Sequence, residues 1–237
     1  MNNGKKTVVV AGLVLCLCVG AQAVQTQLLL PDLNMDMTLL TDGGTYTSLL
    51  PSTQTWNGVT FNLVEDAETG YNAWITSGSA AESLDITVNV FGVTTAYTII
   101  NSKWGRLGTT DGMVEFFGSD GAYHAVALVQ GTNLRDHYDG AFVNVIDGVT
   151  AVSAFYVGSG RARLDMQIYT LPAAFADETL TTIRFTSGAD GASGVPFLVA
   201  ATVDAAGAGT TVPVPGAVVL AALGASVVAG MRRRRML

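Results

Sequence analysis

Apolar and polar residues alternate along several stretches of this 237-residue chain, and this alternation restricts the fold more than any other feature. The clearest case is Leu84–Val90, where every second residue is apolar. Val59–Leu63, Leu164–Tyr169 and Leu180–Phe185 follow the same pattern. A period of two residues is typical of β-strands with one buried face. No stretch of residues 24–204 has the spacing of an amphipathic helix, so the sequence predicts an all-β domain.

Glycine-rich turns separate these stretches. Asp-Gly pairs at 111–112, 139–140 and 147–148 are turn signals, because tight turns need residues that tolerate positive φ. We expect about ten short strands in an antiparallel β-sandwich or jelly roll. Val24–Ser52 is predicted to be a leading segment with an edge strand, and Ala173–Glu178 a single helical turn. The remaining β-rich runs are 93–100, 114–117, 122–129, 142–146, 151–157 and 196–203.

The N-terminus has the three parts of a secretory signal peptide. Lys5 and Lys6 precede an uncharged, mostly apolar run, Thr7–Val19, and Ala21-Gln22-Ala23 supplies the small residues that signal peptidase recognises at Ala21 and Ala23. We expect residues 1–23 to be removed; the alternative is a buried N-terminal helix. Both cysteines, Cys16 and Cys18, lie in this segment. The mature protein would then contain no disulfide, no catalytic thiolate and no cysteine-bound zinc.

The C-terminus, residues 212–237, is equally patterned. A proline-containing motif leads into an uncharged helix predicted over 217–231, and a basic cluster follows. Such a helix spans about 22 Å, and arginine side chains extend its reach in a membrane by snorkelling. The positive-inside rule would place the basic cluster in the cytoplasm and the preceding domain outside. The residues that carry this pattern are Pro213, Pro215, Gly216, Arg232, Arg233, Arg234 and Arg235.

This C-terminal segment resembles a PEP-CTERM sorting signal, the tripartite tag that exosortases process in many Gram-negative bacteria. The usual motif has Glu between the prolines, whereas Val214 stands there in this chain. The resemblance implies an exported protein that is anchored in the membrane transiently and then released to the cell surface or extracellular matrix. Its processing partners would be signal peptidase and an exosortase-like enzyme. The alternative is a plain tail anchor that is never cut.

The part between the two ends is strongly acidic. Residues 24–211 hold all 19 acidic residues and only six basic ones, a formal charge of −13. Nucleic-acid binding needs clustered Lys and Arg, so this charge excludes a nucleic-acid partner. We expect one β-sandwich domain over 24–204, because no Pro- or Ser-rich linker interrupts it, and a flexible stalk at 205–211.

Three segments of this domain resemble galactose-binding-domain-like β-sandwiches: Trp56–Phe61, Val93–Gly105 and Arg163–Ile183. The resemblance is at the level of the fold. It implies a sandwich of the kind found in sugar-binding and adhesive modules, and a fold by itself does not determine the ligand.

Catalytic signatures are missing from the domain sequence. The chain has two histidines and no G-x-S-x-G motif, so no Ser–His–Asp arrangement is indicated. His124 lies on an alternating strand, where we expect it to face solvent. Glu115 and Asp165 are acidic residues on predicted strands and are also expected to face water. The sequence therefore predicts a protein that is not an enzyme.

The densest polar cluster, Arg135–Asp139, lies between predicted strands and is the candidate ligand-binding loop. Arginine offers a planar set of donors, aspartate accepts hydrogen bonds, and tyrosine stacks on sugar rings. The alternative is a solvated loop in which Arg135 pairs with Asp136 or Asp139. The aromatic residues of Tyr71–Trp74 and Lys103–Arg106, both near turns, are candidates for a further sugar platform, although such rings also fill sandwich cores. The candidate site comprises Trp104, Asp120, Arg135, Asp136, His137 and Tyr138.

No cofactor is predicted, but calcium is a candidate ligand because hard cations bind carboxylate and carbonyl oxygens. Its candidate ligands, in turns and loops, are Asp111, Asp120, Asp136 and Asp139. Two functions then remain. The first is a non-enzymatic surface or matrix protein that binds carbohydrate or is adhesive, with extracellular polysaccharide as its partner. The second is a secreted enzyme that acts on polysaccharide.

Overall fold

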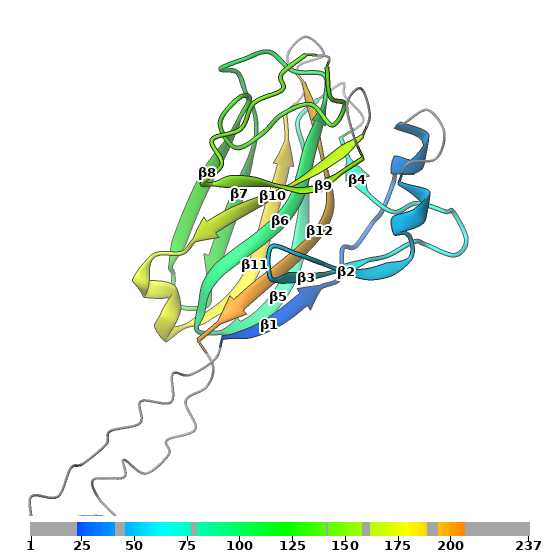
Figure 1. The fold of residues 1–237 in the computed structure, drawn as a ribbon. Helices are drawn as coiled ribbons and strands as arrows, with labels where there is room; N and C mark the ends of the chain where they lie inside the picture. The colour runs from blue at the N-terminus through cyan, green and yellow to red at the C-terminus, as the bar shows by residue number, and fades with distance from the viewer. Residues whose placement is uncertain are drawn as a thin grey trace, which may run out of the picture.

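The computed structural model describes residues 23–40, 46–76, 80–140, 142–157, 162–188 and 194–206, and these form a mostly antiparallel β structure (Figure 1). The predicted signal peptide before Ala23 and the predicted sorting segment, 212–237, lie outside the described residues. Within the described ranges, no helix is both long and apolar enough to cross a membrane.

Twelve strands and three short 3-10 helices make up this structure. The 3-10 helices are η1 (Met37–Leu40), η2 (Thr47–Leu49) and η3 (Ala173–Asp177). The third one confirms the helical turn predicted before Leu180. The strands are β1 (Val24–Leu28), β2 (Ser52–Trp56), β3 (Val59–Leu63), β4 (Trp74–Ile75), β5 (Glu82–Phe91), β6 (Val93–Lys103), β7 (Thr110–Gly118), β8 (Tyr123–Val129), β9 (Ala151–Tyr156), β10 (Arg163–Thr170), β11 (Thr179–Ser187) and β12 (Val195–Ala205).

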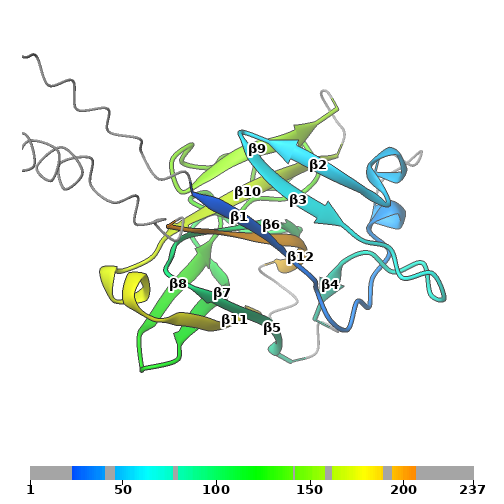
Figure 2. The same ribbon diagram turned by 90° about the horizontal axis from the view of Figure 1, so that it is seen from below.

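The strands form three layers, which Figure 2 shows from below. The central six-stranded sheet has the order β1-β12-β6-β10-β9, and β4 pairs with β12. A four-stranded sheet, β5-β11-β7-β8, packs on one face of it, and the two-stranded β2–β3 hairpin packs on the other. The predicted antiparallel sandwich is therefore confirmed for the two larger sheets. The third layer is an addition that the sequence did not reveal.

Two separate apolar cores explain why the central strand β12 is buried along nearly its whole length. Its alternate side chains enter different cores, with Leu198 and Val203 facing the four-stranded sheet and Phe197 and Val199 facing the hairpin. A strand with both faces covered reads as a continuous apolar run. The hairpin contributes Phe61, which is fully buried, to the second core.

Three details of the predicted domain differ from the structure. Residues 142–146 were predicted as a strand but form none, because the Val143 carbonyl accepts from the Asp136 amide in a loop connection. Ser52–Trp56 forms β2 although its sequence is largely polar. Finally, Ala205 belongs to β12 and Ala206 donates to the Gly92 carbonyl, so the first two residues of the stalk predicted at 205–211 are attached to the sheet; the rest of that segment lies outside the described residues.

Both ends of the described domain lie at the same end of the sandwich. Val24 and Ala205 are register partners, and Ala205 also pairs with Val93 at the start of β6. The other end of β6, Lys103, pairs with Val195. The loops that follow β6 and β8 are therefore at the end far from Val24 and Ala205, as Figure 1 shows. A strand as long as β6 spans about 35 Å.

Candidate functional site

The long segment between β8 and β9, residues 130–150, covers a polar part of the central sheet. Here Arg135 pairs with Asp165 of β10: its Nε donates to Asp165 Oδ2 at 2.7 Å and its Nη2 to Oδ1 at 2.6 Å. Asn101 of β6 donates to the same Oδ2 at 2.7 Å. Asp165 is completely buried, so the prediction that it faces water is wrong: its partner on the covering segment lets its charge be buried.

A second arginine makes the reciprocal connection from the sheet to this segment. Arg163 of β10 is 2 % exposed and donates from Nη1 to Asp139 Oδ1 at 3.0 Å. Its Nε donates to the Asp136 carbonyl, and its Nη2 to the Val143 carbonyl. The predicted alternative pairing of Arg135 with Asp136 or Asp139 is therefore replaced by two ion pairs between loop and sheet. These contacts fix the backbone on both sides of residue 140.

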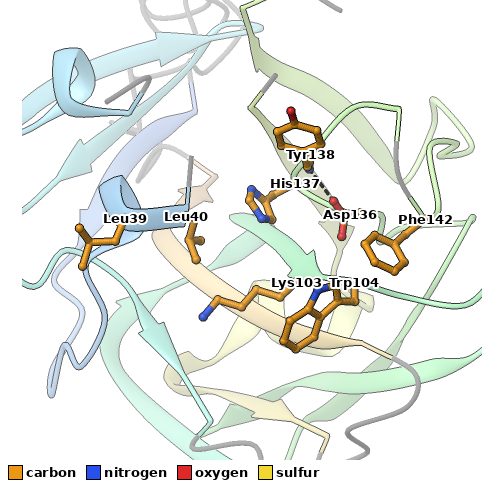
Figure 3. Close-up of a pocket in the computed structure, with 8 residues that line it drawn as sticks. All are labelled: Leu39, Leu40, Lys103, Trp104, Asp136, His137, Tyr138 and Phe142. Atoms are coloured by element: carbon orange, nitrogen blue, oxygen red, sulfur yellow. Dashed lines mark hydrogen bonds between the residues drawn. The ribbon is translucent and has the colours of Figure 1, made fainter. Parts of the chain in front are cut away.

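A pocket of about 400 Å³ opens between this segment, the end of β6 and η1 (Figure 3). Leu39 and Leu40 of η1 form one side, and Trp104 and Phe142 lie on the other. The Lys103 side chain extends toward the η1 side. Three consecutive residues complete the lining: Asp136, His137 and Tyr138.

The turn after β6 holds Trp104 at the pocket mouth. Trp104 has φ 60°, which is rare for a large side chain, and its ring is half exposed. Ser102 Oγ donates to the Trp104 carbonyl at 2.6 Å, and Gln130 Nε2 donates to Ser102 Oγ at 2.7 Å. A Cβ on Gly105 would lie 2.5 Å from the Gln130 side chain, so only glycine fits there. The buried hydrogen bonds of Ser102 and Gln130 thus hold the backbone of this turn in place.

Phe142 is the second aromatic residue at the mouth, and it shares this backbone feature. Its φ is 50° and its side chain is 61 % exposed. Non-glycine residues in this region are strained by about 1–3 kcal/mol, and such strain gathers at binding sites. Two exposed aromatic residues, Trp104 and Phe142, therefore lie beside one pocket, and both have positive φ.

Asp136 and His137 are both buried at the base of the pocket, and their pKa values shift in opposite directions. Burial raises the pKa of Asp136 to about 6, although its Oδ1 accepts from the Tyr138 amide at 2.6 Å. Burial lowers the pKa of His137 to about 4, helped by the nearby charges of Lys103 and Arg163. The His137 ring is therefore neutral at pH 7, and its buried Nδ1 has no hydrogen-bond partner among the described residues.

Four of the six predicted site residues line this pocket: Trp104, Asp136, His137 and Tyr138. Arg135 does not, because its guanidinium is held by Asp165. Asp120 lies in the β7–β8 turn at the opposite end of the sandwich, where its amide donates to Glu178 Oε2. Of the four further lining residues, Lys103 lies in the Lys103–Arg106 segment that the sequence indicated as a candidate sugar platform. The other three, Leu39, Leu40 and Phe142, come together only through the fold.

Other residues singled out in the sequence lie elsewhere. Trp74 is a core ring, buried against Phe185, whereas Trp56 is half-buried and packs on Phe61 at the edge of the second core. His124 is half-buried and stacks on Phe116 with ring centroids 6.0 Å apart. Glu115 is half-buried and accepts from the Tyr123 hydroxyl at 2.7 Å.

The predicted calcium ligands do not gather into one site. Asp139 is paired with Arg163, Asp136 binds the Tyr138 amide, and Asp120 is at the far end of the sandwich. Asp111 is buried and accepts from Gln130 Nε2 at 2.8 Å. In the part of the chain that the structure describes, no three residues of the types His, Cys, Asp and Glu are placed to hold a metal ion.

Comparison with known proteins adds no assignment to this geometry, since the sequence matches no protein-family model and no curated protein.

Proposed function

We propose that the protein is an exported, non-enzymatic component of the cell surface or extracellular matrix that binds carbohydrate in the pocket beside Trp104. The observation that carries this proposal is the pair of exposed aromatic rings, Trp104 and Phe142, held at positive φ over a pocket with polar groups at its base. Aromatic faces stack on the C–H faces of sugars, while Lys103 and the Tyr138 backbone and ring offer polar contacts. The jelly-roll and galactose-binding-like assignments belong to this proposal as well.

The placement of the pocket supports a role at the cell surface. Both ends of the described domain are at one end of the sandwich, and the pocket is at the other. If the C-terminal segment anchors the chain as its sequence predicts, an attached domain can present the pocket away from the membrane. A binding site so placed is accessible to polysaccharide of the matrix.

Replacing Trp104 by Ala is expected to weaken glycan binding about tenfold or more, since an aromatic platform supplies much of the contact area. The measurement is a glycan array on the purified protein with and without calcium, followed by titration of the strongest binder. The stability of the variant should stay within about 1 kcal/mol of the wild type, because Trp104 is 53 % exposed and alanine has a similar backbone strain at this positive φ.

Trp56→Ala is the matched control, because Trp56 is half-buried against the second core and does not line the pocket. It should lower stability and leave the glycan affinity of the folded protein unchanged. Equal loss of binding in both variants, or binding that survives in Trp104→Ala, would place the glycan site elsewhere. An array without any bound glycan would reject the proposed ligand class.

The processing of the chain gives a separate test of export. Mass spectrometry of the protein extracted from the surface of its host should find a mature N-terminus at Val24 and no residues of the Arg-terminated tail. An intact 231–237 segment on the surface protein would instead identify a plain anchor. An intact 1–23 segment would reject export by this signal.

The alternative function, a secreted enzyme acting on polysaccharide, draws on one feature, the raised pKa of Asp136 in the pocket. Glycoside hydrolysis needs a second carboxylate about 5–10 Å away. Asp136 is the one acidic residue among the described residues that line the pocket. The same titrations distinguish an enzyme from a binding protein. An enzyme would shorten the bound glycan, and Asp136→Asn would abolish this cleavage.

A further inference from the structure

A second pocket, of about 360 Å³, lies beside the first and shares Phe142 as a wall. The turn after β6 lines both pockets, with Trp104 in the first and Gly105–Leu107 in the second. The segment after residue 141 does the same, with Phe142 in both and Val143–Val145 in the second. We call the two pockets together the distal groove, since it lies at the end of the sandwich far from Val24 and Ala205.

The distal groove collects the unpaired positive charges of the described domain. The structure describes five basic residues of the domain. Three of them form ion pairs: Arg135, Arg163 and Arg184. The other two are Lys103, which lines the first pocket, and Arg106, which lines the second. Neither has an ion pair with a described acidic residue. In a domain with a formal charge of −13, this concentration of free cations indicates an anionic ligand.

Negative charge within the groove itself is small. Asp136 is the one acidic residue among its described lining residues, and it is 1 % exposed. Arg106 is exposed and Lys103 half-buried, so the groove presents its cations to solvent and keeps its carboxylate covered. Acidic residues farther from the groove than about 8 Å, the Debye length at physiological ionic strength, act only weakly on a ligand there.

The apolar lining indicates what kind of anion fits. Leu107 and Val145 are 69 % and 55 % exposed in the second pocket, beside Phe142. Together with Trp104 they form a discontinuous apolar surface along the groove, of the kind that contacts the C–H faces of sugar rings. A small inorganic anion would leave this surface in water, whereas a chain of sugars covers it.

We propose that the distal groove binds an extended anionic glycan, several sugar residues long, whose carboxylates face Lys103 in one pocket and Arg106 in the other. This inference rests on the proposed carbohydrate binding and specifies its ligand: a chain rather than a single sugar, and an acidic chain rather than a neutral one. Phe142, shared by the two pockets, would contact the chain between them.

Titration calorimetry of the purified protein with galacturonate oligomers tests both parts. The hexamer should bind at least about tenfold more tightly than the dimer, because in this proposal the dimer engages one pocket and the hexamer engages both. The methyl-esterified hexamer, which has the same length without charge, should bind about tenfold more weakly than the acid form. Arg106→Gln should lower hexamer affinity up to about fivefold and leave the dimer unchanged, while Lys103→Gln weakens both.

Arg184→Gln serves as the control, because it removes one positive charge from the exposed pair with Asp85 outside the groove. Equal binding of the ester and acid forms would overturn the anionic ligand and keep the proposed carbohydrate binding. Equal binding of dimer and hexamer would overturn the extended chain. If no glycan binds and the protein instead self-associates in a way that Phe142→Asp abolishes, the groove is an interface between copies and both proposals fail.

Discussion

Replacing Arg135 by Ala should destabilise the protein by about 3–5 kcal/mol, the loss typical of breaking a buried ion pair from one side. Its partner Asp165 is fully buried, and without the guanidinium its carboxylate keeps one described side-chain donor, Asn101. Arg135 also donates from Nη1 to the Asn144 carbonyl at 3.0 Å, so the covering segment loses a tie to the sheet. Urea unfolding followed by circular dichroism measures the change in the free energy of unfolding.

The exposed pair of Arg184 and Asp85 is the internal control for this experiment. Their side chains are 41 % and 51 % exposed, and Arg184 also lies over the Phe117 ring. Removing Arg184 should therefore change the free energy of unfolding far less than removing Arg135. The double change Arg135→Met with Asp165→Leu should recover much of the lost stability, because it leaves no unpaired buried charge. A loss near that of Arg184→Ala would show Arg135 to be dispensable for the fold and would return it to the candidate ligand residues.

The stability of the protein should respond to pH through two neighbouring residues whose effects oppose each other. The folded-state pKa of Asp136 is raised to about 6, so between pH 4 and 6 the folded state holds a proton that the unfolded state has lost. This contribution makes stability fall as pH rises. The folded-state pKa of His137 is lowered to about 4, so the unfolded state holds the extra proton up to about pH 6.5. That contribution makes stability rise with pH.

Single substitutions should separate the two contributions. Relative to wild type, Asp136→Asn should gain about 3 kcal/mol of stability between pH 4 and 6, because the destabilising ionisation is gone. His137→Gln should lose about 3 kcal/mol relative to wild type between pH 4 and 6.5. The reason is that the variant lacks the rise in stability that the wild type gains as His137 loses its proton in the unfolded state. Unfolding free energies measured at half-unit pH intervals give both difference curves.

His124→Gln removes the other histidine of the chain and is the matched control for this pair. It is half-buried on β8 and does not line the pocket, so this variant measures the effect of removing a histidine outside the site. Difference curves that run parallel to the pH axis for both pocket variants would mean that neither group changes its protonation with folding. Curves of the same sign would contradict the opposed shifts.

The sequence determined the strand content and several strand positions of this protein. Val59–Leu63 was predicted with the observed bounds, and Leu84–Val90 lies within β5. Period-two alternation is a local property of strands with one buried face, which is why it can be read without knowing the partners. The turn at Ala173 was also local, since Pro172 begins it.

The tertiary structure alone decided which polar residues form the site. Arg135 and Asp136 are neighbours in sequence, but the first turns into the sheet toward Asp165 and the second faces the pocket with Lys103. Asp165 reads as a solvent-facing residue of an alternating strand because the segment that covers it lies 30 residues earlier. Leu40 and Phe142, about a hundred residues apart in the sequence, line the same pocket from opposite sides. Such long-range contacts leave no periodic signal, because burial of a polar group depends on the partner that the fold supplies.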